Sequence, residues 1–173
     1  MQFKKTTAVL LLAVGTAFLC YFGIKTIQKA SKNKAEQTAT IPNFVLKNSK
    51  GGFFSNPNLQ PNTPSVFIAF HPECEHCQYE AKSINAKQKD LQGIQFVLFT
   101  SASDSATHSF SKAYGLDTLK NIHVVVDSTN EMRRLFDVKT IQTVFIYNAQ
   151  KQLVKRFNGE TKIEAIIKYA TPQ

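Results

Sequence analysis

Residues 67–80 read Phe-Ile-Ala-Phe-His-Pro-Glu-Cys-Glu-His-Cys-Gln-Tyr-Glu, and the other elements of the chain are placed relative to them. The apolar run from Val66 to Phe70 is typical of a buried strand. His71-Pro72 interrupts this run, and an amphipathic helix is expected to open at the motif Cys74-Glu-His-Cys77. The segment therefore predicts a strand, a short turn and a helix that begins with two cysteines.

A cysteine pair with two intervening residues at a strand-to-helix junction indicates a dithiol/disulfide redox site. Cys74 is expected near the helix N-terminus, where unpaired backbone N–H groups and the positive end of the helix dipole favour a thiolate. The thiolate is the form of cysteine that attacks disulfides. Cys77 lies one helical turn later on the same side, so it can resolve a mixed disulfide at Cys74.

Two other interpretations of the pair stay open, namely a structural disulfide and half of a zinc site. A structural zinc site takes four ligands, usually from two such pairs. The chain has only three cysteines, and Cys20 lies in a distant apolar segment. His71 and His76 could complete the set, but ligands so close in sequence seldom reach tetrahedral geometry together. The redox interpretation is favoured, and no metal ligand is assigned.

An uncharged run of nineteen residues, 6–24, lies near the N-terminus. As a helix it would be about 28 Å long, close to the hydrocarbon thickness of a bilayer. Lysines flank the run, and no small-residue cleavage site follows it, so an uncleaved anchor is favoured over a cleaved signal peptide. We predict an N-terminal transmembrane helix within residues 1–25, a polar tether over residues 26–41 and a globular domain over residues 42–173.

The charge of the chain is concentrated beside this apolar run. The formal net charge is +9, but residues 1–35 hold six lysines and no acidic residue. The remainder carries 15 basic and 12 acidic residues, a net charge of +3, which is ordinary for a soluble domain and gives no sign of a nucleic-acid partner. The lysines beside the apolar run are placed to contact anionic lipid.

The side of the membrane on which the domain lies is predicted from two opposing arguments. Two lysines precede the apolar run and four follow it, which favours a cytoplasmic domain. Disulfide chemistry persists on the extracytoplasmic side, where thiols are not kept reduced. We expect a single-pass membrane protein with its domain on the periplasmic or extracytoplasmic side.

Apolar segments and amphipathic segments alternate along the rest of the chain. Strands are expected at 44–46, 65–70, 94–100, 121–127, 143–147 and 152–157, with a short strand after the turn at 49–52. Helices are expected at 75–91, 104–114, 129–136 and 161–170. The strands are almost continuously apolar, which predicts an α/β fold with a parallel or mixed sheet covered on both faces.

This order of elements resembles the thioredoxin fold over residues 41–170. The added helix and strand between residues 100 and 127 resemble the TlpA/ResA-like branch of membrane-anchored thiol–disulfide oxidoreductases. The motifs that carry the resemblance are the Cys74–Cys77 pair, Glu80 three residues later, and the segments 138–145 and 155–159. The resemblance implies a central mixed sheet flanked by helices.

The resemblance also implies roles for individual residues. Cys74 would be the nucleophile, Cys77 the resolving thiol, and Glu80 a carboxyl group that tunes both and helps proton transfer. Protein thiols and disulfides would be the partners, in contact with the residues beside the pair: Glu75, His76, Ile141 and Gln142. No organic cofactor is implied, because the electrons reside in the cysteines.

The sequence departs from the family pattern at two positions. Glu73 stands where the family usually has Trp before the nucleophile, and its charge opposes a thiolate at Cys74. Gln142 occupies the position of the family's cis-proline. A cis bond before a residue other than proline costs about 2.5–4 kcal/mol, so the Ile141–Gln142 bond is predicted to be trans. Restoring proline at position 142 is expected to raise exchange with protein disulfides.

Two alternative functions stay open. A non-catalytic thioredoxin-like module for binding or metal handling is one, because the proline normally shapes the groove for the disulfide partner. A peroxiredoxin-type peroxidase is the other and is less favoured. That family has Thr or Ser three residues before its reactive cysteine, and His71 occupies that position here.

Overall fold

The structure is a computed structural model that describes the backbone of residues 3–171, with side chains in that range except at 3–14, 17 and 33–35. The chain divides into two compact units between Glu36 and Gln37. Each unit is described here by itself.

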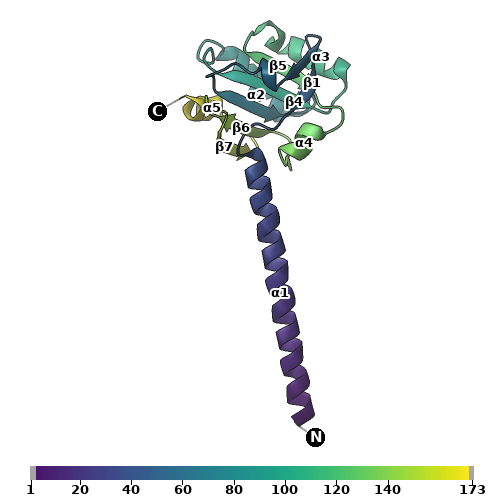
Figure 1. The fold of residues 1–173 in the computed structure, drawn as a ribbon. Coiled ribbons are helices and arrows are strands. Elements are labelled where there is room, and N and C mark those ends of the chain that lie inside the picture. The colour runs from purple at the N-terminus through teal and green to yellow at the C-terminus, as the bar shows by residue number, and fades with distance from the viewer. Residues whose placement is uncertain (1–2, 172–173) are drawn as a thin grey trace. The chain divides into compact units, whose positions relative to one another are not determined.

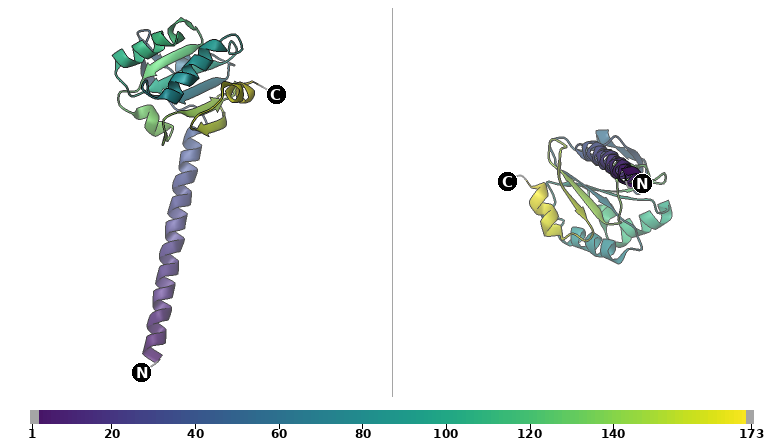
Figure 2. Two further views of the ribbon diagram at one scale, coloured as in Figure 1. Left: turned by 180° about the vertical axis from the view of Figure 1, so that it is seen from behind. Right: turned by 90° about the horizontal axis from the view of Figure 1, so that it is seen from below.

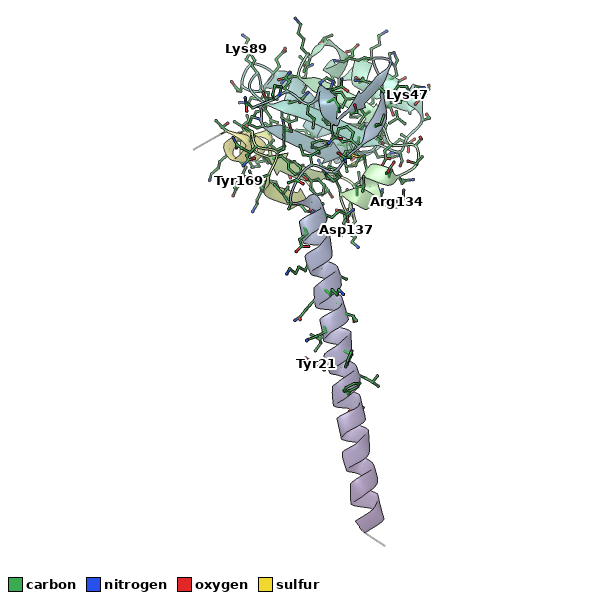
Figure 3. The ribbon with its side chains drawn as sticks, viewed as in Figure 1. Tyr21, Lys47, Lys89, Arg134, Asp137 and Tyr169 are labelled. Carbon is green, nitrogen blue, oxygen red and sulfur yellow. The ribbon has the colours of Figure 1, made fainter. Side chains whose placement is uncertain are left out.

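The N-terminal unit is a single helix, α1 (Phe3–Thr38), of 36 residues (Figure 1). The helix continues through most of the segment expected to be a polar tether. Its described side chains up to Gln37 are exposed, as at Tyr21, which is 54% exposed (Figure 3). Among the residues that the structure describes, no helix is both long and apolar enough to cross a bilayer. The first part of the expected anchor, up to residue 14, lies outside the described side chains, so the anchor stays a prediction.

The second unit is built on one seven-stranded mixed sheet with the order β2-β1-β5-β4-β3-β6-β7 (Figure 1). Its strands are β1 (Val45–Asn48), β2 (Phe53–Ser55), β3 (Ser65–Ala69), β4 (Gln95–Thr100), β5 (Ile122–Val126), β6 (Thr143–Tyr147) and β7 (Leu153–Asn158). Strands β3, β4 and β5 are parallel, whereas β1, β6 and β7 run antiparallel to their neighbours. The prediction of a mixed sheet is confirmed.

Four helices complete this unit: α2 (Glu75–Ala86), α3 (Asp104–Ala113), α4 (Glu131–Leu135) and α5 (Ile163–Ala170), with 3₁₀ turns η1 (Asn56–Asn58) and η2 (Leu116–Thr118). The views from different sides show helices on both faces of the sheet (Figure 2). Lys47, on β1, and Tyr169, on α5, lie at the surface toward opposite edges of the domain (Figure 3).

Alternate residues of the central strands enter two separate apolar clusters. Val66 and Ile68 of β3 pack with the apolar side chains of α2, α3 and α5. Phe67 and Ala69, which point the other way, pack with α4 and the β1–β2 hairpin. Because both faces are covered, every residue of β3, β4 and β6 is buried, which explains the continuous apolar runs in the sequence.

The helix that carries the cysteines is shorter than expected, because α2 ends at Ala86 and not at 91. Only the small Ala86 is apolar between Ile84 and Leu91, so no large apolar side chain holds a further helical turn against the sheet. The chain instead forms tight turns, with the N–H of Asp90 donating to Lys87 and that of Ile94 to Leu91. Leu91 is still fully buried, so the turns return an apolar side chain to the core.

The start of the domain is tied to β6 and β7. The hydroxyl of Tyr147 donates to the main-chain oxygen of Thr38 over 3.0 Å, and the N–H of Leu153 donates to Ala39 over 2.8 Å. Thr40 forms an isolated bridge with Gln152. Residues 38–40 therefore pair with the sheet, a few residues before the expected boundary at 42.

Candidate active site

The two cysteines lie where β3 passes into α2. The N–H of Phe70 still pairs with Phe99 of β4, and the chain then turns so that the N–H of Cys74 donates to His71 over 3.1 Å. Cys74 is the N-cap of α2, and its carbonyl accepts the N–H of Gln78 over 3.0 Å. The carboxyl ends of parallel strands are where α/β sheets place their binding sites, and β3 delivers the cysteines to that edge.

Cys74 and Cys77 are both free thiols, with different environments. Cys74 is half-buried, whereas Cys77 is 2% exposed and packs into the apolar cluster. Burial raises the pKa of the Cys77 thiol to about 12, and a hydrogen bond with the Cys74 side chain acts in the same direction. The pair therefore consists of one accessible thiol and one sheltered thiol that holds its proton.

Glu80 is the third functional side chain that the sequence predicts, and it is 4% exposed. It follows Cys77 by three residues, so the two side chains share one face of α2. Burial raises the pKa of Glu80 to about 7, the charge of Glu160 adds to this shift, and a hydrogen bond with the Gln142 side chain opposes it. Its Oε1 has no hydrogen-bond partner among the described residues. A carboxyl group in this state can take up and release a proton near neutral pH.

Gln142 meets the cysteine helix from the loop before β6. Its side-chain Nε2 donates to the main-chain oxygen of His76 over 3.0 Å. Its backbone is in the left-handed region, with φ +66°. The Ile141–Gln142 bond is trans, as predicted, and no described peptide bond is cis.

The residues expected to contact a partner differ in exposure. Glu75 and His76 are exposed on the first turn of α2, and Ile141 is 41% exposed in the loop. Gln142 is only 3% exposed, so its side chain contacts the protein interior and not the surrounding solvent. The expected contact of Gln142 with a partner therefore stays a prediction, and it would involve the backbone of this loop more than the side chain.

The expectation that proline at position 142 would raise exchange also needs correction. Proline fixes φ near −65°, far from the +66° of Gln142. It would also remove the N–H that donates to Ala69 over 2.8 Å at the end of β3. The loop is built for a residue with a left-handed backbone and a donor, so proline does not fit it.

Glu160 is a site residue that the sequence did not reveal. Its carboxylate lies 2.9 Å from Nδ1 of His76, and both side chains are largely exposed. The two residues are distant in sequence, and nothing in the pattern after Gly159 indicates the pairing. Within the described residues, no three His, Cys, Asp or Glu side chains are arranged to hold a metal ion.

Comparisons with known proteins agree with this geometry. The chain is 28% identical over 169 residues to the thiol-disulfide oxidoreductase ResA of Bacillus subtilis (strain 168), a match that covers 95% of this chain and 88% of that protein. A secreted Mycobacterium tuberculosis disulfide oxidoreductase homologous to E. coli DsbE superposes with a TM-score of 0.63 at 21% identity, over 78% of this chain and 97% of the other. StoA from Bacillus subtilis superposes with a TM-score of 0.61 at 20% identity, over 77% and 99%.

The two superpositions confirm the thioredoxin-like fold expected from the order of elements. The family model described as the AhpC/TSA family matches residues 37–156. The matched segment starts at Gln37, the first residue of the second compact unit. Since this match spans well over half of the sequence and includes both Cys74 and Cys77, the chain belongs to the AhpC/TSA family.

Proposed function

We propose that this protein is a thiol–disulfide oxidoreductase that exchanges disulfides with protein partners through Cys74 and Cys77. The observation that carries the proposal is the pairing of a half-buried thiol at the N-cap of α2 with a buried thiol one turn later. The similarity to a protein named as a thiol-disulfide oxidoreductase over 95% of the chain supports it.

The reaction in the reducing direction has two steps. The Cys74 thiolate attacks one sulfur of a partner disulfide, a Cys74–partner bond forms, and the partner's other sulfur leaves as a thiolate. The Cys77 thiol then loses its proton and attacks Cys74, which releases the second partner sulfur. Two electrons pass to the partner, and the protein is left with a Cys74–Cys77 disulfide. The same steps in reverse oxidise a partner dithiol.

Glu80 is the group that takes the proton from Cys77 in this scheme. A thiol with a pKa of about 12 is a poor nucleophile at neutral pH without a base. Glu80, with a pKa of about 7, is partly ionised there and lies on the same helical face. The proton moves from Cys77 Sγ to the Glu80 carboxylate as the thiolate attacks.

The partner chain would dock on the exposed residues around Cys74. Glu75 and His76 supply polar groups, and Ile141 supplies an apolar contact on the facing loop. An exposed apolar side chain in the loop whose next residue bonds to the cysteine helix suits an extended peptide segment that carries a cysteine. We assign no organic cofactor to this reaction, because the cysteines carry the electrons.

Trapping of the mixed disulfide tests the proposal. The reduced full-length Cys77→Ser variant should accumulate a Cys74–partner disulfide with a protein substrate that carries intact disulfides, such as insulin, and the Cys74→Ser variant should form none. The wild-type protein should turn over with a dithiol reductant. A wild-type protein that turns over no protein disulfide but retains Zn²⁺ would support the metal-handling alternative instead.

We further propose that the N-terminal apolar run tethers the domain to a membrane on its extracytoplasmic side. The uncharged run of residues 6–24 and its flanking lysines support the membrane tether. Disulfide exchange supports the extracytoplasmic side of the membrane, because disulfides persist there. After cell fractionation the protein should remain with membranes in an alkaline carbonate wash and be digested by protease added outside the membrane. Release of a shortened soluble form would indicate a cleaved signal peptide.

A further inference from the structure

A small cavity lies beside the cysteine turn, at the edge of the sheet where β3, β4 and β5 end. Its volume is about 30 Å³, and its lining includes Ala69 of β3, His71 of the turn before Cys74, and Ile141 of the loop before β6. Asp127, the residue after β5, lines it as well. The cavity has room for roughly one or two groups of the size of a water molecule.

Asp127 is the most deeply buried polar residue of this cavity, since only 1% of it is exposed. Its Oδ2 accepts the N–H of Arg133 over 3.1 Å, and its own N–H donates to the main-chain oxygen of Thr100 over 2.7 Å. These bonds fix the carboxyl group and the backbone that carries it. Its Oδ1 has no hydrogen-bond partner among the described residues. A buried carboxylate oxygen without a hydrogen bond costs free energy, so the cavity favours a ligand that brings a donor.

His71 supplies a hydrogen-bond donor to the same cavity. Its ring Nδ1 accepts the N–H of Glu73 over 3.3 Å, which assigns the ring proton of the neutral imidazole to Nε2. Nε2 is therefore a donor. The residues that line the cavity thus offer an acceptor, Oδ1 of Asp127, and a donor, Nε2 of His71, to a group that enters it.

This combination of an acceptor and a donor selects a hydroxyl group. A hydroxyl can donate its proton to Asp127 and accept one from His71 at the same time, and it is small enough for the cavity. An ammonium group has three donors and no acceptor, and the positive charge of Arg133, which also lines the cavity, repels it. A carboxylate would be repelled by Asp127, and a methyl group would leave Oδ1 unpaired.

The cavity is within reach of a chain that is bonded to Cys74. His71 precedes Cys74 by three residues, so their Cα atoms are at most about 11 Å apart, and the N–H of Cys74 donates to the His71 carbonyl. Ile141 is 41% exposed and precedes Gln142, whose side chain bonds to the cysteine helix. An extended chain advances about 3.3 Å per residue, so a side chain roughly two or three positions from the partner's cysteine reaches the cavity.

We propose that this cavity is a subsite of the docking surface and binds a serine or threonine hydroxyl of the protein partner, close to the partner's reactive cysteine. This inference rests on the proposed function. The hydroxyl donates to Oδ1 of Asp127 and accepts from Nε2 of His71. The subsite selects among partner sequences and has no part in the chemistry of sulfur.

An exchange equilibrium between two peptides tests the subsite. In the full-length variant with Cys20→Ser and Cys77→Ser, Cys74 is the only thiol that remains. Cys74 is loaded with an alanine-based peptide through the single cysteine of that peptide. The free thiol of a second peptide, in which serine replaces one alanine, is then added. One protein–peptide disulfide replaces another, so the equilibrium constant reports the contribution of the new side chain. The same exchange on glutathione corrects for differences between the peptide thiols.

Serine is placed in turn at each position on either side of the peptide's cysteine. We expect one position at which serine is preferred over alanine by about tenfold, because a hydrogen bond to a charged group contributes that much. Lysine at that position should gain no preference over alanine. Asp127→Asn should remove most of the serine preference, because an amide N–H group would replace the acceptor.

A second variant fills the cavity and leaves Asp127 in place. Val138 lines the cavity and is 7% exposed, so Val138→Leu adds a methylene group to its wall. This variant should also lose the serine preference. Val154→Leu is the matched control, because Val154 is 44% exposed on β7 and should retain the preference.

Equal affinity for serine and alanine at every position would overturn the proposal and would mean that the cavity takes up water only. A serine preference that survives both Asp127→Asn and Val138→Leu would overturn it too, because the hydroxyl would then bind elsewhere. If no peptide forms a disulfide with Cys74, the proposed oxidoreductase function itself fails. The two failures are therefore distinguishable.

Discussion

Nδ1 of His76 lies 2.9 Å from a carboxylate oxygen of Glu160, so the first turn of the cysteine helix and the chain after β7 meet at the surface beside the buried Glu80. Both partners are largely exposed, so the pair adds little to stability. Its importance is electrostatic, because the charge of Glu160 helps to keep Glu80 protonated.

Glu160→Gln should lower the pKa of Glu80 below its present value of about 7, because one source of repulsion is lost. Titration of the Glu80 carboxyl carbon by NMR in the full-length protein measures the shift. Glu164→Gln, on the exposed face of α5, serves as the charge-matched control and should leave the midpoint in place.

Cys74 should react with iodoacetamide much faster than Cys77. Cys74 is half-buried, whereas Cys77 is 2% exposed and has a pKa of about 12. At pH 8 a thiol with that pKa is thiolate in roughly one molecule in ten thousand. Mass spectrometry of quenched time points assigns the order of labelling. Equal rates at the two cysteines would remove the basis for the proposed roles, and faster labelling of Cys77 would reverse them.

Glu80→Gln should stabilise the protein at alkaline pH while impairing the resolving step. The folded pKa of Glu80, about 7, lies above its ordinary value of 4.5, so the folded state binds more protons than the unfolded state between these pH values. Stability therefore falls as pH rises through this window, by an amount on the order of 3 kcal/mol when complete. The variant should gain stability against urea at pH 8 and little at pH 4. An equal gain in unfolding free energy at both pH values would contradict the rise in the pKa of Glu80 caused by burial.

Gln142→Pro should destabilise the domain and lower exchange on every substrate. Proline cannot adopt φ +66°, and Ala69 would lose the N–H that its carbonyl accepts. The combined cost is about 2–4 kcal/mol of unfolding free energy. Urea denaturation compares the variant with Gln142→Gly, which suits the backbone. A proline variant that is as stable as wild type and exchanges faster would show that the loop can adopt a second conformation.

Ile141→Ser should weaken exchange with a protein disulfide and spare exchange with oxidised glutathione. Ile141 is 41% exposed and precedes Gln142, whose side chain bonds to the cysteine helix, so it can offer an apolar contact to a docked chain but has no part in the chemistry of sulfur. The expected loss is roughly tenfold in kcat/KM, the effect of one apolar contact of about 1.4 kcal/mol. Val154→Ser, 44% exposed on β7, is the matched control. Equal loss on both substrates would place Ile141 outside the docking surface.

Local patterns in the chain were enough to predict the elements that carry the cysteines. The β3–α2 unit is predicted by three features that lie close together in the sequence: a continuous apolar strand, a break at His71-Pro72, and two cysteines one helical turn apart. None of these features depends on residues far away in the chain. The length of α2 was overestimated, because the buried Leu91 looked like part of the same helical face, whereas it is reached through a series of turns.

The sequence by itself determined the thioredoxin-like order of elements, the redox pair and the presence of Glu80 on the same helical face as Cys77, because each depends on residues close together in the chain. Only the tertiary structure decided the environment of that carboxyl group. Gln142 meets His76 across 66 positions of sequence, and Glu160 is brought to the same place from the end of β7. Burial and long-range hydrogen bonds, which set the pKa of Glu80, arise only when the sheet brings these loops to one edge.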